Sequence, residues 1–454
     1  MESFEGQMKR TPSQETISTK LERIANQASK YPEQAFTTLA HHIDIEWLRE
    51  AYRRTRKDGA AGVDGQTASD YERDLEGNLG SLLDRFKAGT YRAPPVLRVY
   101  IPKADGTRRP IGIPTLEDKI LQRAVSMILE AIYEQDFLDC SYGFRPRRSA
   151  HQALEVIRNG LMDMRGGWLL EIDIKSYFDT LEHRHMRDFL DKRVGDGVIR
   201  RMIHKWLKAG VMEAGELREG EAGTPQGGVI SPLLANVYLH EVLDGWFETE
   251  VRRRMRGQSF MVRYADDAVL VFERKDDAER VMEVIGRRFA KYGLELHPDK
   301  TCLVEFVAPG ASRRRRGGDE DGPGSFDLLG FTHMWGKSRK GNWVVQRKTA
   351  KGRLARALQH MTSWCRRNRH RAVKEQHKVL CWKLRGYYGY YGITGNARAL
   401  ERYWDEVTRI WHKWLNRRSG RKHMRWERFK LLLARYPLPR PRIVHSALRR
   451  PANP

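Results

Sequence analysis

Cysteine is scarce in this sequence, and its spacing excludes two kinds of site. Only four cysteines occur among 454 residues, at positions 140, 302, 365 and 381. Zinc sites and disulfide frameworks need ligand residues in close pairs, and these cysteines form no such pair. We therefore expect reduced thiols and a cytoplasmic location.

Long apolar runs are also missing. No stretch approaches the length of a membrane-spanning helix, and the N-terminus lacks the apolar core of a signal peptide. We therefore expect no membrane partner. Residues 1–35 are largely polar, and we expect them to be loosely ordered.

Positive charge is in excess, and the excess lies near the C-terminus. Residues 336–454 carry 32 Lys and Arg against 5 Asp and Glu, whereas residues 1–335 carry 51 against 53. The same C-terminal part holds seven of the twelve tryptophans. Basic side chains interleaved with aromatic rings suit a phosphate backbone and unstacked bases. The pattern favours a nucleic-acid partner over a merely solvated basic face.

The periodicity of apolar residues predicts an α/β part followed by a helical part. Two strands, at residues 97–100 and 111–113, are expected to meet in a hairpin. Strands alternate with amphipathic helices from residue 168 to residue 305, as in an α/β layer. Residues 313–324 are of low complexity and predict a surface loop without an assigned role. Helices are predicted at residues 43–56, 116–133, 351–369, 370–388 and 397–418.

Two apolar segments present carboxylates at one end. In the strand expected at residues 168–174, alternation places Leu169, Glu171 and Asp173 on one face. Later in the chain, apolar arms flank Ala265-Asp266-Asp267, which predicts a β-hairpin with carboxylates at its tip. Three carboxylates placed close together repel one another, and this arrangement is unfavourable unless a cation binds between them. Mg²⁺ prefers such oxygen ligands together with phosphates, although an acidic surface turn is the simpler interpretation of two adjacent Asp.

A series of segments resembles, in order, the motifs of group II intron reverse transcriptases. Residues 264–267 (YADD) resemble the signature hairpin of reverse transcriptases. The resemblance covers roughly residues 40–445 and implies an RNA-directed DNA polymerase. The other matching segments are 99–114 (VYIPKADGTRRPIGIP), 142–147 (YGFRPR), 173–179 (DIKSYFD), 223–232 (GTPQGGVISP), 294–301 (LELHPDKT), 328–331 (LLGF) and 385–391 (RGYYGYY).

The resemblance implies an α/β right-hand polymerase, with fingers and palm, and an α-helical thumb or maturase domain. We expect an N-terminal extension with the first block at residues 1–80 and fingers and palm at 81–335. A helical thumb at 336–419 and a basic tail at 420–454 would follow. The tail has ten Lys or Arg and one acidic residue, which predicts DNA binding. Alternatively, the helical spacing of Trp426, Phe429, Leu432 and Leu433 packs the tail onto the thumb.

The resemblance also implies roles for single residues. Asp173, Asp266 and Asp267 would be the catalytic carboxylates. Asp173 and Asp266, with the backbone carbonyl of Ile174, would bind two Mg²⁺ ions, for which Mn²⁺ can substitute. Lys300 would protonate pyrophosphate, although a solvated surface lysine is the simpler interpretation.

Further residues would contact the substrates. Phe178 would exclude a ribose 2′-hydroxyl, unless it only packs in the core. Lys103, Arg109 and Gln226 would lie around the incoming nucleotide. Nucleic-acid contacts are expected from Arg385, Tyr387, Arg417, Arg418, Arg421, Lys422 and Arg425.

Three functions fit these residues. The first is a group II intron protein that binds structured intron RNA, assists its splicing and copies it from a DNA primer with dNTPs at a DNA target. The second is a free-standing relative in defence or DNA repair, and the third is a splicing factor without polymerisation. The intact carboxylates disfavour the third. After Arg418 the chain has two His and no Cys, so the HNH-type endonuclease domain of many intron proteins is expected to be absent. A bacterial-type, nucleoid-associated location would follow when the protein is on DNA.

Overall fold

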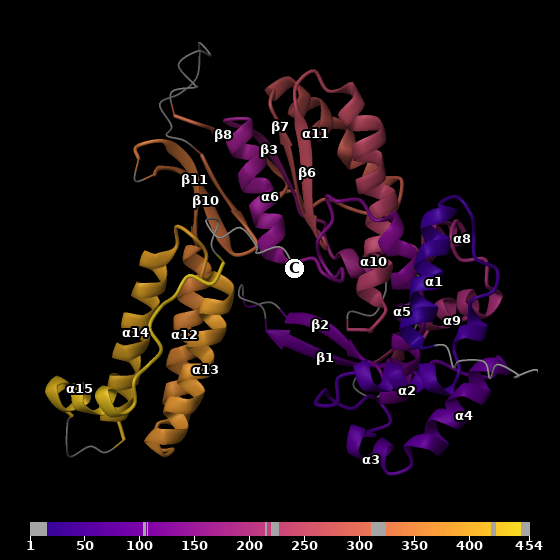
Figure 1. Ribbon diagram of the computed structural model, residues 1–454, viewed down its shortest axis with the longest axis horizontal. Coiled ribbons are helices and arrows are strands. Elements are labelled where there is room, and N and C mark those ends of the chain that lie inside the picture. Colours follow the sequence, from indigo (N-terminus) through magenta and orange to yellow (C-terminus); the bar gives the residue numbers. More distant parts are fainter. Residues whose placement is uncertain are drawn as a thin grey trace, which may run out of the picture.

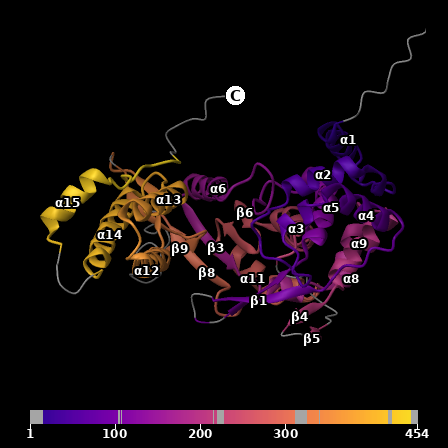
Figure 2. The ribbon, with the colours of Figure 1, turned by 90° about the horizontal axis from the view of Figure 1, so that it is seen from below.

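The computed structural model describes residues 16–102, 106, 108–213, 216–218, 227–309, 324–338, 340–418 and 424–445. The molecule is elongated, with N-terminal helices at one end, a helical C-terminal domain at the other and sheets between them (Figure 1 and Figure 2). Within these described ranges, no helix is long and apolar enough to cross a membrane.

Helix α5 (Leu116–Asp136) is the centre of the N-terminal half, because apolar residues on several of its sides are buried by neighbouring helices. Helix α1 packs on it through Ile24 and Ala28. The expectation that residues 1–35 are loosely ordered is therefore wrong for the helical stretch, whose apolar residues recur at helical spacing. The predicted helix at 43–56 is confirmed as α2. The neighbours are α1 (Ile17–Lys30), the 3-10 turn η1 (Ala40–His42), α2 (Ile45–Arg54), α3 (Ala68–Glu72) and α4 (Leu75–Lys87).

A four-stranded sheet with the order β2-β1-β4-β5 lies beside these helices. The predicted hairpin is confirmed, since β1 and β2 pair antiparallel from Leu97 opposite Ile113 to Pro102 opposite Arg108. The turn that joins the two strands lies largely outside the described residues. The strands are β1 (Val96–Pro102), β2 (Arg108–Ile113), β4 (Val211–Glu213) and β5 (Glu216–Arg218).

A second sheet, with the order β6-β7-β3-β8, forms the middle of the molecule, and all its pairings are antiparallel. Helix α6 (Ala150–Asp163) covers one face and α11 (Lys275–Ala290) covers the other (Figure 1). Leu169 faces the α6 side, whereas Leu170 and Ile172 face the main core, so the predicted alternation is confirmed. The strands are β3 (Gly166–Ile172), β6 (Ser259–Tyr264), β7 (Asp267–Phe272) and β8 (Cys302–Val307).

Short helices complete the main core. The chain between α10 and β6 continues from helix into two π-helical stretches and one 3-10 turn. These elements are α7 (Tyr177–Thr180), α8 (His183–Asp191), α9 (Gly197–Leu207), α10 (Ser231–Leu239), η2 (His240–Asp244), η3 (Phe247–Val251) and η4 (Arg252–Arg254).

A three-stranded sheet, β11-β10-β9, leads into the C-terminal helices. These helices share a core around the fully buried Trp411, and α12 packs along α14. The three helices predicted between residues 351 and 418 are confirmed. The elements are β9 (Ser325–Leu328), β10 (Phe331–Lys337), β11 (Trp343–Thr349), α12 (Lys351–Asn368), α13 (Val373–Tyr391), α14 (Ala397–Asn416) and α15 (Trp426–Arg435).

After α15, the chain runs back without regular structure along α13. Tyr388 donates a hydrogen bond from its hydroxyl to the carbonyl of Pro439 at 3.1 Å, and Leu438 is buried. The amide of Val444 donates to the carbonyl of Gly392 at 2.7 Å. This end of the chain is docked on the helical domain as far as residue 445.

Candidate active site

Asp173 directly follows β3, at the end of the central sheet. Its carbonyl accepts the amide of His297 at 2.8 Å, and the amide of Lys175 donates to the carbonyl of Glu295 at 2.8 Å. These two bonds fix an antiparallel bridge between Ile174 and Leu296. Because both bonds belong to the neighbours of Ile174, the bridge does not engage the Ile174 carbonyl.

The predicted hairpin with carboxylates at its tip is confirmed. Strands β6 and β7 pair up to Tyr264 opposite Asp267, which leaves Ala265 and Asp266 as a two-residue turn. Ala265 adopts a left-handed conformation, with φ of 58°. Gly143 lies directly against this turn, since a Cβ on it would come within 2.2 Å of the Ala265 nitrogen. The tip is therefore held in place by the backbone beside it.

A buried ion pair stabilises the β6–β7 hairpin. Arg263 and Asp244 are both fully buried, and two guanidinium nitrogens donate to the two carboxylate oxygens at 2.7 and 2.5 Å. Arg263 also donates to the Ala265 carbonyl at 2.9 Å and to Asn236 Oδ1 at 3.0 Å. The buried charge is thus paired and hydrogen-bonded, as burial requires, and its bond to the Ala265 carbonyl fixes the turn. Sequence reasoning missed this residue, although an arginine inside an apolar strand is a visible signal.

The structure brings the three predicted carboxylates together. Burial by the surrounding protein, with the negative charges of Asp266 and Asp173, raises the pKa of Asp267 to about 6, while Arg353 and Lys300 oppose the shift. The Asp267 side chain still reaches solvent. Lys300 lies 3.3 Å from a carboxylate oxygen of Asp173. Negative charge is therefore gathered at this end of the sheet, and Lys300 and Arg353 partly offset it.

A cavity of about 510 Å³ opens beside these carboxylates. Asp173, Asp267 and Glu171 line this cavity, and so do Arg353 and Arg356 of α12. Burial, with the charges of Asp327 and Asp267, raises the pKa of Glu171 to about 7. A cavity lined by both carboxylates and guanidinium groups suits metal-bound phosphates and the backbone of a nucleic-acid strand. Sequence reasoning missed the two arginines, which α12 brings to the site from elsewhere in the chain.

The carboxylates fit divalent metal ions. In the described part of the chain, no group of three His, Cys, Asp or Glu side chains is arranged to hold a metal ion by itself. Mg²⁺ in nucleotidyl-transfer sites takes one or two carboxylates and completes its coordination with water and substrate phosphates. Asp173, Asp266 and the open carbonyl of Ile174 supply such a partial set of oxygen ligands.

The residues predicted around the nucleotide are described only in part. Arg109 lies on β2 opposite Ile101, with an exposed side chain. Phe178 is half-buried and packs against the main core, its ring centroid 5.4 Å from that of Tyr177. Lys103 and Gln226 lie outside the described residues.

A buried polar network holds the loop that follows Gln226. Gln122 accepts the amides of Val229 and Ile230 through its Oε1, at 2.7 and 3.3 Å. Its Nε2 donates to Asp118 Oδ2 at 2.8 Å. Asp118 Oδ1 accepts the indole N–H of Trp206 at 2.7 Å and the hydroxyl of Tyr91 at 3.0 Å. Burial raises the pKa of Asp118 to about 6. Sequence reasoning missed both residues, because a polar residue on an apolar helix does not reveal its distant partners.

The residues that were predicted to contact nucleic acid differ in their exposure and contacts. Arg385 and Arg425 are exposed, and Arg417 lies over the ring of Trp414 at 5.2 Å. Arg418 donates to the carbonyls of Arg369 and Arg371. Arg421 and Lys422 lie outside the described residues. Tyr387 is only 9% exposed and stacks on Tyr403, so packing accounts for it in this structure.

Comparison with known proteins agrees with this geometry. The profile of the family described as reverse transcriptase (RNA-dependent DNA polymerase) matches residues 101–333. Protein YkfC of Escherichia coli (strain K12) is 38% identical over 291 residues, which are 57% of this chain and 76% of that protein. The group II intron-encoded protein LtrA of Lactococcus lactis subsp. cremoris is 38% identical over 226 residues, which are 49% of this chain and 37% of LtrA. A structure of telomerase from Candida albicans with a fragment of telomeric RNA aligns with a TM-score of 0.41 and 14% identity, over 81% of this chain and 65% of that one.

Proposed function

This chain belongs to the reverse transcriptase (RNA-dependent DNA polymerase) family, and we propose that it serves a group II intron, whose RNA it binds, helps to splice and copies into DNA. The family profile and the similarity to LtrA, a group II intron-encoded protein, support a reverse transcriptase of the maturase type. The fold is the α/β right-hand polymerase, in which β3, β6, β7 and β8 form the palm, β1 and β2 belong to the fingers and α12–α14 form the thumb.

The convergence of Asp173, Asp266 and Asp267 at one end of the palm sheet carries this proposal. Asp173, Asp266 and the Ile174 carbonyl would hold two Mg²⁺ ions, which Mn²⁺ can replace. When bound, these ions lower the pKa of a primer 3′-hydroxyl and stabilise the leaving pyrophosphate. Asp267 supports the site by adding negative charge at the edge of the cavity. Lys300, 3.3 Å from Asp173, is placed to donate a proton to pyrophosphate.

The substrates would enter from two sides. Arg109, with Lys103 and Gln226, would orient the triphosphate of the dNTP, and Phe178 would meet its sugar. Arg353 and Arg356 line the same cavity as the carboxylates. They would contact the backbone of the primer strand there.

The helical domain would bind the structured intron RNA and the DNA target. Its side chains pair cations with rings, as in Lys378 over Trp382 at 5.0 Å and Arg440 over Trp404 at 4.1 Å. Trp382 is 57% exposed, although a large apolar ring normally prefers burial. Stacking faces beside positive charge suit unpaired bases and phosphates.

Primer extension by the purified chain tests the polymerase proposal. We expect DNA synthesis from a DNA primer annealed to an RNA template, with loss on chelation of divalent ions and recovery when Mg²⁺ is restored. Absence of extended product on every RNA template tried, with folded protein, would refute it.

A further inference from the structure

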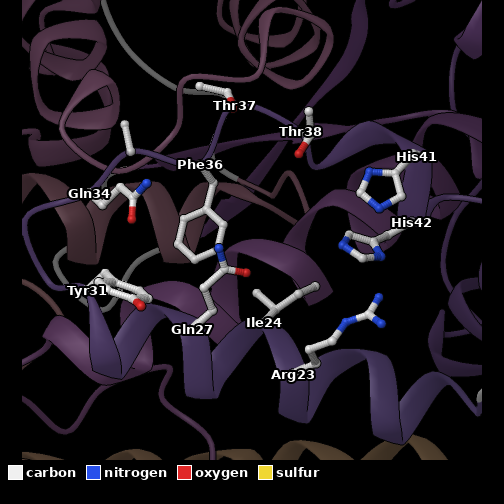
Figure 3. A pocket seen from close by; sticks show the side chains of 11 residues that line it. Arg23, Ile24, Gln27, Tyr31, Gln34, Phe36, Thr37, Thr38, His41 and His42 are labelled. Carbon is white, nitrogen blue, oxygen red and sulfur yellow. The ribbon is translucent and has the colours of Figure 1, made fainter.

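Buried polar side chains hold loops of this protein in place. One example lies in the N-terminal part, where Arg193 donates to the carbonyls of Ala28, Tyr31 and Gln34 at 2.9, 2.7 and 2.8 Å. These bonds support the wall of a pocket between α1 and η1, which Figure 3 shows. None of the described residues that line this pocket also lines the catalytic cavity. A second example lies beside the catalytic turn and centres on Asn236 of α10.

The side chain of Asn236 is buried, with 1% exposure, and both of its polar atoms are hydrogen-bonded. Its Nδ2 donates to the carbonyl of Gly143 at 2.7 Å, and its Oδ1 accepts from Arg263 at 3.0 Å. Only this orientation of the amide satisfies both partners, because a carbonyl cannot donate and a guanidinium cannot accept. Asn236 therefore joins the segment before α6 to the strand that precedes the catalytic turn.

The two partners of Asn236 meet again at Ala265. Arg263 donates to the Ala265 carbonyl at 2.9 Å, and a Cβ on Gly143 would come within 2.2 Å of the Ala265 nitrogen. Ala265 has a φ of 58°, which is unfavourable for a residue with a side chain, so its surroundings must hold it there. Both sides of Ala265 are thus held by groups to which Asn236 is bonded, and Asp266 is the next residue.

The segment 140–147, which we call the edge loop, is itself fixed against β6. The amide of Arg263 donates to the carbonyl of Cys140, and the amide of Tyr142 donates to the carbonyl of Arg263, both at 2.8 Å. Within this loop, Phe144 has a φ of 57° and is 58% exposed. A bulky residue keeps such a conformation only where its neighbours fix the backbone. The edge loop is therefore held in one shape directly beside the catalytic turn.

We infer that Asn236 is a positioning residue for polymerisation, which keeps the edge loop and the catalytic turn together and so sets the position of the Asp266 carboxylate. The inference rests on the proposed function, in which Asp266 binds metal ions with Asp173. Because it is buried, Asn236 acts through Gly143 and Arg263 and does not itself contact substrate. Loss of its side chain would leave a buried carbonyl and a buried N–H without partners, and these groups would regain partners only if the two segments moved.

Two variants of Asn236 and one control test this role. Asn236→Leu removes both hydrogen bonds and keeps a side chain of similar size. Asn236→Asp is milder, because it still accepts from Arg263 and loses only the bond to Gly143. The control is Asn396→Leu, since Asn396 is also 1% exposed and is bonded through both polar atoms, but to β11 and α13.

Hydrogen–deuterium exchange of the metal-free protein measures how firmly the two segments are held. We expect Asn236→Leu to exchange about tenfold faster than wild type in peptides that cover residues 140–147 and 264–267. Asn236→Asp should exchange faster in the same peptides by a smaller factor. The control should exchange faster only around β11 and α13.

A second measurement separates positioning from packing. Binding of Mn²⁺ without nucleotide, followed by electron paramagnetic resonance, should weaken about tenfold in Asn236→Leu and stay unchanged in Asn396→Leu. In primer extension, the kcat of Asn236→Leu should fall about tenfold, with little change in the KM for dNTP. If Asn236→Leu does not fold, Asn236→Asp serves for the same comparisons.

Three results would overturn the inference. The first is unchanged exchange at residues 264–267 in both Asn236 variants, and the second is an equal loss of Mn²⁺ binding in the control. The third is faster exchange with unchanged Mn²⁺ binding and unchanged kcat, because the contact would then serve packing alone. Wild-type protein that extends no primer would instead contradict the polymerase proposal, while exchange and Mn²⁺ binding would still decide the role of Asn236.

Discussion

The pKa of Asp267 shows how the surroundings of the site change the properties of a single carboxyl group. Its ordinary pKa is 3.8, and burial with the charges of Asp266 and Asp173 raises this pKa to about 6. A carboxyl with a raised folded pKa binds more protons in the folded than in the unfolded protein between these values. The folded state therefore loses stability as pH rises from about 4 to about 6, and the loss persists above that range.

The change Asp267→Asn should remove this loss of folding stability, because an amide does not ionise. We expect the variant to be more stable than wild type at pH 7, by on the order of 1 kcal/mol after discounting for solvent that reaches the carboxylate. The difference should vanish near pH 4, where Asp267 is protonated in wild type. Chemical denaturation of both proteins across this pH range, without divalent ions, measures it. A difference of the same size in the free energy of unfolding at pH 4 would show that another contact is responsible.

Phe178 gives a second test at the residue scale. Its ring packs on the main core but keeps part of its surface open. If that surface meets the nucleotide sugar, Phe178→Ala should raise the incorporation of ribonucleotides relative to deoxyribonucleotides. Phe137→Ala, a change of the same size in the same core cluster, serves as the control for packing. An equal ratio in wild type and Phe178→Ala would assign Phe178 to core packing alone.

At the scale of elements, α5 controls the position of a loop. A carboxylate only accepts hydrogen bonds, so Asp118 turns the Gln122 amide with Nε2 toward itself and Oε1 toward the amides of Val229 and Ile230. The loop is also pressed on β2, where a Cβ on Gly227 would come within 2.4 Å of the Gly112 carbonyl. The strand of Arg109 and the residues after Gln226 are thereby held together.

Asp118→Asn should disturb this arrangement without changing the size of the side chain. The new amide would present a donor to Gln122, whose amide would then turn its Nε2 toward the loop amides. We expect the KM for dNTP to rise about tenfold, with a smaller change in kcat. The control is Glu117→Gln, one residue away on the same helix and paired with Arg85. Steady-state extension with varied dNTP separates this outcome from loss of fold, which would lower kcat and the melting temperature together.

Most helices and strands could be predicted from the sequence, whereas contacts between distant segments could not, for a physical reason. The β6–β7 hairpin was predictable because its pattern is local and both arms are apolar. Helix α1 carries the same kind of local pattern, but its polar surroundings obscured it. The pairing of Arg263 with Asp244 and the approach of Arg353 to Asp267 depend on the packing of segments far apart in sequence. Periodicity carries no information about such contacts.

At the scale of the whole molecule, the basic C-terminal part is integrated into the helical domain. Phe429 of α15 is fully buried, and its ring centroid lies 5.8 Å from that of Trp411. Deleting residues 420–454 would uncover this core, so deletion cannot separate DNA binding from packing. The predicted boundary at residue 420 and the DNA-binding role of the tail remain predictions.

Charge removal on the exposed face of α15 avoids that difficulty. Arg428→Ala with Lys430→Ala changes exposed side chains only. If this face contacts target DNA, the slope of log affinity against log salt should fall by about two, one for each lost phosphate contact. Arg287→Ala near the end of α11, with Lys291→Ala directly after that helix, removes the same charge from another exposed surface. Equal slopes for the two double variants would contradict a specific role of α15.

The most direct test of the whole account is Asp266→Ala with Asp267→Ala, assayed for primer extension and for RNA splicing in one preparation. The carboxylates would serve polymerisation, whereas RNA docking would use the basic helical domain, so the two activities should separate. We expect extension to fall to background while splicing of the intron RNA persists. Substantial extension by this variant, in protein that is folded and binds RNA, would contradict the assignment of the active site.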